Sequence, residues 1–552
     1  MAEQPAALPF SGIWTRLRSP IGSAGAVLVG GAALAGLALL LAQPLPAGAP
    51  IAPHIFTYLF SRNEPVAAWV AIGILLAAAI LARGIPFPER AFVARLSTDP
   101  RAFIAAATAV LAAAALIVYR AHPLSMDEYA PLFQARVFAY GRLAGQVPPE
   151  LLPRLVPPIR WFIEAAPSGA MLSSYWPGFA LLLTPFVLLG CPWLLNPLIG
   201  GATLFLTWRL ARRLWPETSA PGWAVLLTAA SPAFTVNAIS FYSMGAHLAA
   251  SLCFAVLVLE RRLFLAGAVG SLALALHNPF PHTLFALPWI AEVARRPGRV
   301  RNLARLALGY APGGLVLLGG WMWCRARFTH PMETRGGLLA GLDLIRRLAF
   351  TAPSLDLLLV RTMNVAELAS WGVPLLLPLA ALGAVRSWSQ PPARLLSLSA
   401  VLTLVGYGFV QFDQGHGWGF RYFHGSWGVL PLLAAGGLES ARTSATLRRL
   451  ALAAGVCSLL LCTPLRFWQV RTFIDAHLAQ LPASEGAQSV VFVDILRGSY
   501  TVDLVQNDPF LGGNRWLLIS FGDREDRAFM QAYFPRARRT AAGAFGSVWQ
   551  VD

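Results

Sequence analysis

Two adjacent carboxylates, Asp127 and Glu128, follow a long apolar run of this sequence. They stand in SMDEYAPLFQARVFAYGR, which also holds Arg136 and Arg142, and the apolar run RAFIAAATAVLAAAALIVY comes shortly before it. A carboxylate can take a proton from a hydroxyl group, and arginine can stabilise the negative charge of a phosphate. The pattern predicts a polar site at the end of an apolar helix. A solvated loop start or a helix N-cap is the alternative for the two carboxylates.

Other polar residues that could bind a ligand stand beside later apolar runs. They are Tyr175 in SSYWPG, His247 in SMGAHLAA, His277 and His282 in HNPFPH, and Arg421 and Tyr422 in GWGFRYFHG. For each histidine taken alone, a hydrogen-bonded structural role is the commoner explanation. For Arg136, snorkelling to the membrane surface competes with contact to a phosphate. The glycines around Arg421 would let the backbone approach a ligand closely.

Composition places the chain in a membrane. Of its 552 residues, 56% are hydrophobic and only 12% are charged, and the mean hydropathy is +0.58. Soluble domains carry about 25% charged residues. Apolar runs long enough to cross a bilayer recur and predict a mainly α, polytopic protein with about 12–14 spans. The clearest runs are 21–43, 66–82, 103–119, 305–324, 364–385 and 396–412.

The basic residues indicate orientation rather than nucleic-acid binding. The net charge is +17, and all 43 basic residues are arginine, clustered between apolar runs. Such clusters are typical of cytoplasmic joints in membrane proteins. Without lysine there is no phosphate-binding loop of the kind that ATPases use, so any cationic contact to a phosphate must come from arginine. The five cysteines have no metal-ligand spacing.

Placing the arginine clusters inside gives a topology and a domain plan. Residues 1–102 form two additional N-terminal helices, with the N-terminus cytoplasmic. Residues 103–465 form the main membrane domain, with a first large external loop at 120–176. Residues 466–552 form a small α/β domain on the outer face. The segment 176–208 is left open between one broken span and two short helices around Pro192 and Pro197.

Local patterns predict elements on that outer face. LFQARVFAYGRL is expected to form an amphipathic helix at the membrane interface, with Phe133, Val137 and Tyr140 on one side. In the tail, short β-rich runs at 489–496, 515–522 and 547–552 predict strands, and residues 524–534 predict a helix.

The sequence resembles the C-type glycosyltransferases, in particular the bacterial family-39-like group that includes protein O-mannosyltransferases and the lipid A aminoarabinose transferase. The resemblance covers about residues 103–430. It is carried by DEYAPLFQARVFAYGRL, by the segment beginning YWPGFALLLTPF, by SPAFTVNAISFYSMGAHLAASL and by GWGFRYFHG. The chain departs from the group in two respects. Two spans precede the usual first one, and Tyr175-Trp176-Pro177-Gly178 stands where the group has Tyr-Pro-Pro-Gly.

The resemblance implies an inverting transfer of a sugar from a polyprenyl-phosphate donor on the outer face of a bacterial inner membrane. It implies Asp127 as the catalytic base and Glu128 as its neighbour or substitute. Arginines such as Arg136 or Arg421 would bind the donor phosphate. A lipid, glycan or protein would supply the acceptor hydroxyl.

Neither a cofactor nor nucleic acid is expected. Asp127, Glu128 and the outer histidines could ligate a divalent metal, but no spacing requires one and none is predicted. The alternatives to an enzyme are a flippase for lipid-linked sugars and a non-catalytic scaffold of the cell envelope. The absence of an internal repeat and the gathering of polar residues on one face favour the enzyme.

Overall fold

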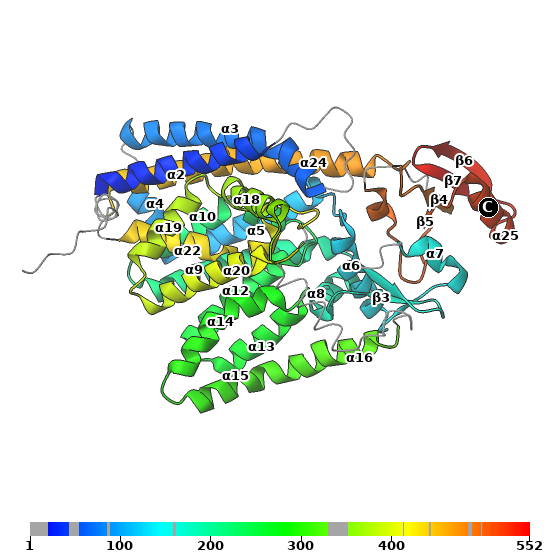
Figure 1. The fold of residues 1–552 in the computed structure, drawn as a ribbon, viewed down its shortest axis with the longest axis horizontal. Coiled ribbons are helices and arrows are strands. Elements are labelled where there is room, and N and C mark those ends of the chain that lie inside the picture. The colour runs from blue at the N-terminus through cyan, green and yellow to red at the C-terminus, as the bar shows by residue number, and fades with distance from the viewer. Residues whose placement is uncertain are drawn as a thin grey trace, which may run out of the picture.

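The structure, a computed structural model, describes residues 20–42, 55–84, 89–157, 162–328, 352–411, 413–440, 443–483, 488–497 and 500–551. Long helices run roughly parallel to one another, and a small sheet stands beyond one end of the bundle (Figure 1). This confirms the predicted fold class, a helical membrane protein with a small C-terminal α/β unit.

The longest apolar helices agree with the sequence. Among the described residues, four helical stretches are long and apolar enough to cross a membrane: Gly22–Leu41, Ile55–Arg83, Arg299–Arg325 and Ala445–Leu478. They correspond to α2 (Pro20–Leu41), α3 (Ile55–Gly84), the run from α15 (Arg299–Gly313) through the π-helical turn η3 (Gly314–Gly320) to α16 (Trp321–Arg325), and the run from α23 (Ala445–Cys457) through η5 (Ser458–Cys462) to α24 (Thr463–Leu478). A bent pair that includes α4 (Glu89–Thr98) and α5 (Arg101–Ile117) turns by 87°.

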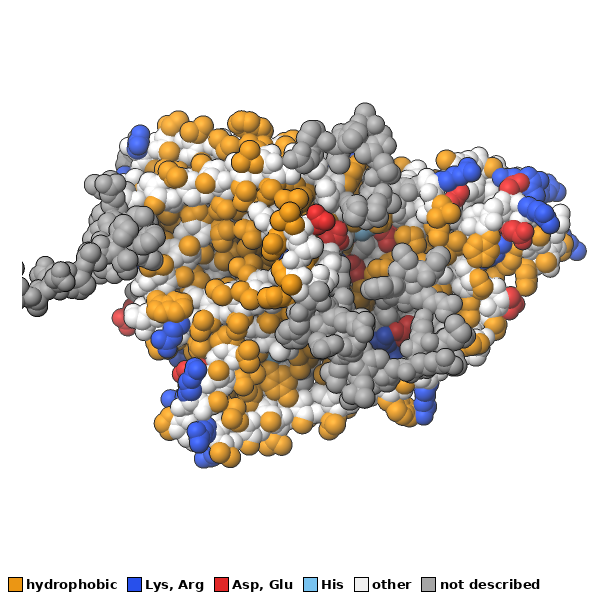
Figure 2. Space-filling model, viewed as in Figure 1, with side chains coloured by type: hydrophobic (Ala, Val, Ile, Leu, Met, Phe, Trp, Pro, Cys, Tyr) orange, Lys and Arg blue, Asp and Glu red, His pale blue; other side chains and the backbone are white. Residues whose placement is uncertain are grey.

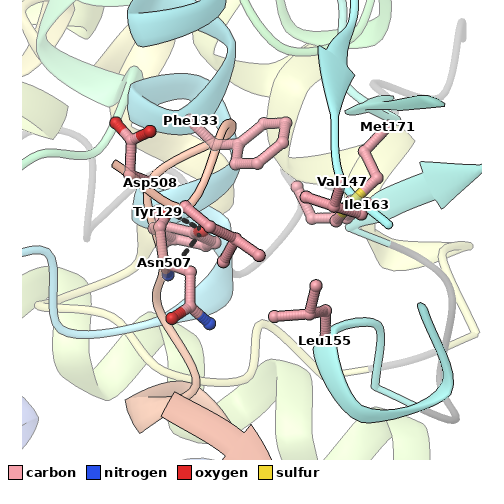
Figure 3. Close-up of a pocket in the computed structure, with 9 residues that line it drawn as sticks. Tyr129, Phe133, Val147, Leu155, Ile163, Met171, Asn507 and Asp508 are labelled. Atoms are coloured by element: carbon pink, nitrogen blue, oxygen red, sulfur yellow. Dashed lines mark hydrogen bonds between the residues drawn. The ribbon is translucent and has the colours of Figure 1, made fainter. Parts of the chain in front are cut away.

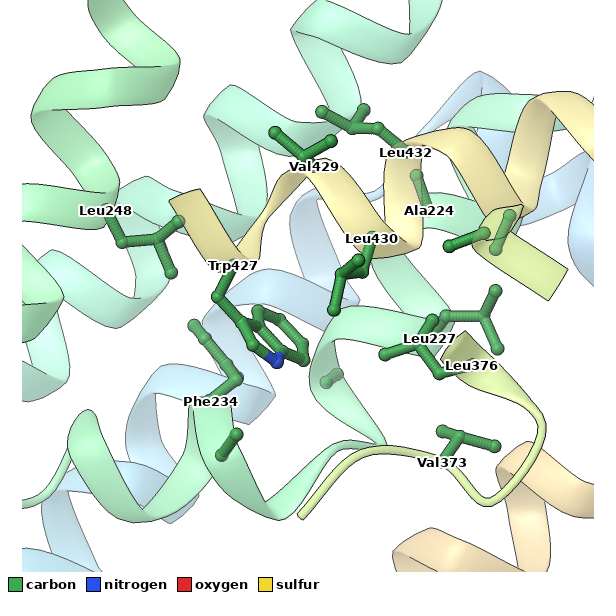
Figure 4. Packing of buried hydrophobic residues seen from close by; sticks show 14 of the residues in the cluster. Ala224, Leu227, Phe234, Leu248, Val373, Leu376, Trp427, Val429, Leu430 and Leu432 are labelled. Carbon is green, nitrogen blue, oxygen red and sulfur yellow. The ribbon is translucent and has the colours of Figure 1, made fainter. Parts of the chain in front are cut away.

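Shorter helices fill the middle of the bundle. They are α8 (Pro177–Leu188), α9 (Leu195–Leu214), α10 (Ala220–Ala229), α11 (Pro232–Asn237), α12 (Met244–Leu259), α13 (Leu263–Ala275), α14 (Phe280–Arg295), α18 (Leu355–Ser370), α19 (Leu376–Arg386), α20 (Pro391–Gly408), α21 (His424–Trp427) and α22 (Val429–Glu439). Apolar side chains of all these helices except α8 contribute to one core cluster, in which Trp427 packs among Phe234, Leu248 and Leu430 (Figure 4).

One segment differs from its prediction from hydropathy, and a second matches one of the two alternatives that the sequence left open. The apolar run 364–385 is not one helix, because the chain leaves α18 at Ser370 and starts α19 only at Leu376. At this break the Trp371 carbonyl accepts a hydrogen bond from Ala233 N and Val373 N donates to Ser231 Oγ, which satisfies the freed backbone groups. The open segment 176–208 forms two helices, α8 and α9, with the short 3₁₀ turn η2 (Pro192–Leu194) between them.

The arginine-rich joints come together at one end of the bundle. Ser97 Oγ of α4 donates to the Ser219 carbonyl (3.0 Å), and Ser219 N donates to Glu439 at the end of α22 (3.2 Å). Arg386 at the end of α19 donates to Thr443 (2.7 Å). Hydrophobic side chains dominate the described surface of the helical bundle in the view of Figure 2.

The opposite end carries the segment between α5 and α8. It contains α6 (Met126–Ala139), the turns η1 (Pro149–Leu151) and α7 (Leu152–Leu155), and a sheet of β1 (Gly145–Gln146), β3 (Ala170–Ser173) and β2 (Ile163–Ala165) in that order. Both pairings are antiparallel, with Gly145 opposite Met171 and Ile163 opposite Ser173.

The expectation for the helix at LFQARVFAYGRL was half wrong. The segment is helical, but α6 does not lie on a membrane surface. Phe133 and Val137 are buried in a protein core shared with Val490 and Phe492 of the C-terminal sheet. Tyr140 is exposed, and its ring contacts Phe510 at 4.8 Å between centroids. The apolar face predicted for lipid is covered by the chain itself.

The C-terminal unit has a four-stranded sheet in the order β5-β4-β7-β6. Strands β4 (Ser489–Val493), β5 (Arg515–Ile519) and β7 (Gly546–Gln550) and helix α25 (Asp523–Tyr533) lie where the sequence predicted them. β4 pairs parallel with β5 and antiparallel with β7. β6 (Arg538–Gly543) pairs antiparallel with β7 and was missed, because RRTAAG is too polar to signal a strand.

Candidate functional site

Asp127 is the second residue of α6 and lies at the centre of a polar contact set. Arg421 Nη1 donates to Asp127 Oδ2 at 2.7 Å, and Tyr175 Oη donates to Asp127 Oδ1. The side chain of Asp127 is 18% exposed, whereas that of Arg421 is 7% exposed. Three segments remote in sequence therefore converge on one carboxylate that still reaches solvent.

A glycine-rich loop builds the cradle of Arg421. Gln414 Oε1 accepts Arg421 N at 2.9 Å, and the Gln414 carbonyl accepts Arg421 Nη2. Gln414 Nε2 in turn donates to Glu367 of α18 at 3.0 Å. Gly417 has φ +154° and faces Arg421, where a Cβ would lie 3.1 Å from Arg421 Cδ. The loop curls around the guanidinium group because Gly417 has no side chain.

Aromatic rings complete the cradle. The ring of Tyr242 lies under the Arg421 guanidinium, with 4.9 Å between Cζ and the ring centroid. Such a contact favours a desolvated cation. Tyr242 Oη hydrogen-bonds Ser125 Oγ, the N-cap residue of α6, at 3.0 Å.

Tyr175 is held on the other side of Asp127. Its ring lies against His277 at 4.3 Å between centroids, and its carbonyl accepts Trp321 Nε1 of α16 at 2.8 Å. Tyr175 directly precedes α8, which packs closely on α13. A Cβ at Gly178 of α8 would lie 2.7 Å from the Ala275 carbonyl oxygen of α13. This explains the glycine of the YWPG segment.

The electrostatics of the site keep Asp127 ionised. Burial alone would raise the pKa of Asp127, but the charge of Arg421 and the hydrogen bonds from Tyr175 and Arg421 outweigh it and lower the pKa below its ordinary value. Burial, and then the Asp127 charge, raises the pKa of Tyr175, so its hydroxyl stays protonated and donates. Burial lowers the pKa of His277 to about 4, although Asp127 opposes the shift. His277 is therefore neutral at neutral pH.

Glu128 has a different environment. It is fully buried, and each of its oxygens accepts two hydrogen bonds. Oε1 accepts Tyr119 Oη (2.8 Å) and Phe241 N (2.8 Å), and Oε2 accepts Leu124 N (2.7 Å) and Ser125 N (3.3 Å). Burial raises the pKa of Glu128 to about 7, against these four donors, which lower it. This carboxylate ties the start of α6 to the helices behind it and has no free side for a substrate.

Replacing Glu128 with glutamine should therefore destabilise the protein rather than remove a catalytic group. The amide NH₂ must face N–H donors that now meet a carboxylate oxygen, which costs about 2–4 kcal/mol. Denaturant unfolding of the detergent-purified protein would measure the loss.

Glu150, an exposed residue of η1 in the same segment between α5 and α8, provides the matched control. Glu150→Gln should change stability by less than about 0.5 kcal/mol. A Glu128→Gln protein that unfolds like the wild type but is inactive would contradict the structural role of Glu128.

The structure gathers only some of the predicted ligand-binding residues around Asp127. Arg421, Tyr175 and His277 are there. Arg136 lies nine residues further along α6, about 13 Å along the helix axis. Arg142 lies over the Phe510 ring at 5.2 Å, at the C-terminal unit.

Three more predicted residues lie beside the site rather than in it. Tyr422 stacks on Tyr407 at 4.8 Å and donates to the Asp413 carbonyl. His247 of α12 is buried below the site, and its Nε2 has no hydrogen-bond partner among the described residues. His282 of α14 lies 2.7 Å from Tyr310 Oη through Nε2. The structural role fits His282.

The residues that sequence reasoning missed are the ones that support the site. Gln414 and Tyr242 hold Arg421, and Tyr119 holds Glu128. Their types are common and they stand in apolar or glycine-rich surroundings. Only the alternation of glycine at 415, 417 and 419 pointed to this loop. Over the described residues there is no group of three or more His, Cys, Asp or Glu side chains that could hold a metal ion.

Fold and site together define a polytopic helical protein with a partly exposed carboxylate–arginine pair at the end of its helices. No protein-family model matches the sequence, and no curated protein matches it. Among solved structures, the chain is similar to ArnT from Cupriavidus metallidurans bound to undecaprenyl phosphate, with 12% identity and a TM-score of 0.49 over 81% of this chain and 98% of that one. The apo state of the same protein gives 12% identity and a TM-score of 0.48 over 80% and 97%. This likeness concerns the course of the chain, and the chemistry of the site follows from this chain's own residues.

Proposed function

We propose that this protein is an inverting glycosyltransferase that moves a sugar from a polyprenyl-phosphate donor to an acceptor hydroxyl. One observation carries the proposal: Asp127 is a partly exposed, ionised carboxylate paired with a buried arginine, at the end of the bundle opposite the arginine-rich joints. Because such joints favour the cytoplasmic side, the site would face the outer side of the membrane. The sequence resemblance to C-type glycosyltransferases supports the donor class.

The proposed reaction is a single displacement. The acceptor oxygen bonds to the anomeric carbon of the sugar while the bond from that carbon to the phosphate oxygen breaks. The electron pair of that bond stays on the phosphate, and the acceptor proton passes to Asp127. A phosphate monoester has a second pKa of about 6, so it can leave without a general acid.

The surroundings of Asp127 fit one base rather than a nucleophile and an acid. Its only carboxylate neighbour in sequence, Glu128, is saturated by four donors and faces away from solvent. Arg421 has two roles in this proposal. It keeps Asp127 ionised before the reaction and offers its charge to the phosphate as negative charge develops there. The acceptor hydroxyl would approach on the exposed side of Asp127.

The decisive experiment is a transfer assay with purified protein in proteoliposomes. The donors would be a panel of polyprenyl-phosphate sugars, each with its sugar radiolabelled. A membrane extract would serve as the acceptor source, and each assay would be run with and without a chelator. Transfer of at least one sugar supports the proposal. Movement of labelled donor across the vesicle with no transfer in any arm would favour a flippase instead. Transfer lost on chelation would show a metal that the site residues do not predict.

The pH dependence of the reaction follows from the lowered pKa of Asp127. A base with a depressed pKa stays ionised as the pH falls and becomes protonated only below the ordinary range of an aspartate. We therefore expect kcat/KM to keep its plateau between about pH 5 and 7. An acid limb in the middle of that range would show that another group is the base. The measurement is the initial rate at low donor concentration in buffers of constant ionic strength.

A further inference from the structure

The C-terminal unit holds the first turn of α6. Asp503, in the 3₁₀ turn η6 (Thr501–Leu504), accepts the Met126 N–H through Oδ1 at 2.9 Å. Three residues on, Gln506 donates to the Pro123 carbonyl at 2.8 Å. Tyr129 Oη donates to the Asn507 carbonyl (2.6 Å) and accepts Asn507 N (2.9 Å) (Figure 3). Residues 503–507 thus form hydrogen bonds on both sides of Asp127, at Pro123, Met126 and Tyr129.

A small cavity marks the same junction. It lies between α6, the sheet β1-β3-β2 with α7, and residues 507–511. Tyr129 and Asn507 line one side, and Leu155, Ile163 and Met171 line the other (Figure 3). The lining is mostly apolar, so this part of the junction is held by packing and not by hydrogen bonds. The directional bonds come from Asp503 and its neighbours, and the bond of Asp503 is to Met126, the residue immediately before Asp127.

The second carboxylate oxygen of Asp503, Oδ2, faces a histidine. Asp503 is 5% exposed, and Oδ2 has no hydrogen-bond donor among the described residues. His416, 6% exposed, faces it from the glycine-rich loop of Arg421, with 3.5 Å between His416 Nε2 and Asp503 Oδ2. His416 Nε2 also lacks a partner within the described residues. Two buried polar atoms that face each other cost free energy unless a proton lies between them.

The surroundings decide which residue carries that proton. Burial raises the pKa of Asp503 to about 8, aided by the charges of Asp127 and Glu128 and opposed by the Met126 N–H. Burial lowers the pKa of His416 to about 3. Both shifts put the proton on the carboxyl and leave the imidazole neutral. The charged or titratable groups that face the pair are Asp127 and Glu128 on α6, Arg421 on the loop, His477 on α24 and Tyr500 beside the His416 ring.

We propose that Asp503 is protonated at neutral pH, donates a hydrogen bond from its carboxyl O–H to His416 Nε2, and together with His416 positions Asp127 through the Met126 N–H. The inference deepens the proposed function and rests on Asp127 being the base. Asp503 and His416 are positioning residues, since neither touches the reacting atoms. The pair joins the C-terminal unit, the loop of Arg421 and the helix of Asp127 at one point. The C-terminal unit is then part of the catalytic apparatus.

Two substitutions of Asp503 separate its proton from its charge. In Asp503→Asn the amide oxygen can still accept the Met126 N–H, and the amide NH₂ can donate to His416 Nε2. This variant should keep kcat within about threefold of wild type. Asp503→Leu can do neither and should lower kcat by about 10²-fold, the effect of misplacing a catalytic group by about 1 Å. KM for the donor should change little in both, because no substrate contact is lost.

Two results with the Asp503 variants would overturn the proposal. An Asn variant as inactive as the Leu variant would show that a charged carboxylate is needed. A fully active Leu variant would show that the pair does not position Asp127. Tyr129→Phe is the matched control for loosening of the junction, because it removes both bonds to Asn507 without touching the pair. If it lowers kcat as strongly as Asp503→Leu, general loosening explains the loss and the pair has no special role.

A spectroscopic readout keeps this proposal distinct from the proposed function. Infrared difference spectra at neutral pH, wild type minus Asp503→Asn, should show the carbonyl stretch of a protonated carboxylic acid. An absent band would overturn the proton assignment even if wild type transfers sugar. A band from a wild-type protein that transfers no sugar in any arm of the donor panel would support the proton assignment and reject the function.

Discussion

The Asp127→Asn protein should fold as the wild type does and lose sugar transfer by about 10²–10⁴-fold in kcat, the usual contribution of a general base. An amide cannot take the acceptor's proton. It can keep both structural contacts of the site, since its oxygen can accept from Arg421 and its NH₂ can donate to Tyr175 Oη. Single-turnover transfer from preformed enzyme–donor complex would measure the chemical step apart from donor binding.

The control for this substitution is Asp99→Asn. Asp99 is 69% exposed and lies between α4 and α5, at the opposite end of the bundle. Its substitution should leave kcat and stability unchanged. An Asp127→Asn enzyme with more than half of wild-type kcat would reject Asp127 as the base. If Asp127→Asn also prevented donor binding, measured with undecaprenyl phosphate as the probe, Asp127 would be a binding residue instead.

Local patterns predicted the parts of this protein that depend on local physics. Apolar length placed α2, α3 and α20, and short β-rich runs placed β4 and β7. An acidic pair after an apolar run pointed to Asp127, because carboxylates at a membrane boundary are costly unless something pairs them. The structure supplies that partner as Arg421, at 2.7 Å.

What the sequence could not give were contacts between remote segments. Hydropathy made 364–385 one span, but the break between α18 and α19 is held by Ser231 and Ala233, more than a hundred residues earlier. The apolar face of α6 fits a lipid surface as well as a protein core. Only the position of the C-terminal sheet decides between them.

The same limit applies to the two carboxylates. Asp127 and Glu128 are chemically alike and adjacent, so the sequence could not tell which of them is the proposed base and which has a structural role. Their partners separate them, and most of these come from elsewhere in the chain: Arg421 and Tyr175 for one, Tyr119 and the Phe241 N–H for the other.

The second large effect is expected at Arg421. Arg421→Gln should lower kcat by about 10²–10³-fold, because in the proposed reaction it removes the charge that stabilises the leaving phosphate. Arg421→Lys keeps the charge but cannot reproduce the fork, since one ammonium cannot bond both Asp127 and the Gln414 carbonyl in the same geometry. It should fall between the wild type and the Gln variant. Equal activity of the Lys variant and the wild type would show that only charge matters here.

The pH profile of the Arg421 variants tests the coupling between Arg421 and Asp127. With Arg421 present, its charge holds the Asp127 pKa below the ordinary value, against the effect of burial. Without that charge burial dominates, the pKa rises, and Asp127 takes up a proton at a higher pH. The acid limb of kcat/KM should therefore move upward in Arg421→Gln and stay near its wild-type position in Arg421→Lys. A limb that stays in place in both variants would mean that the base lies outside the field of Arg421, and the pairing of the two residues would then be structural alone.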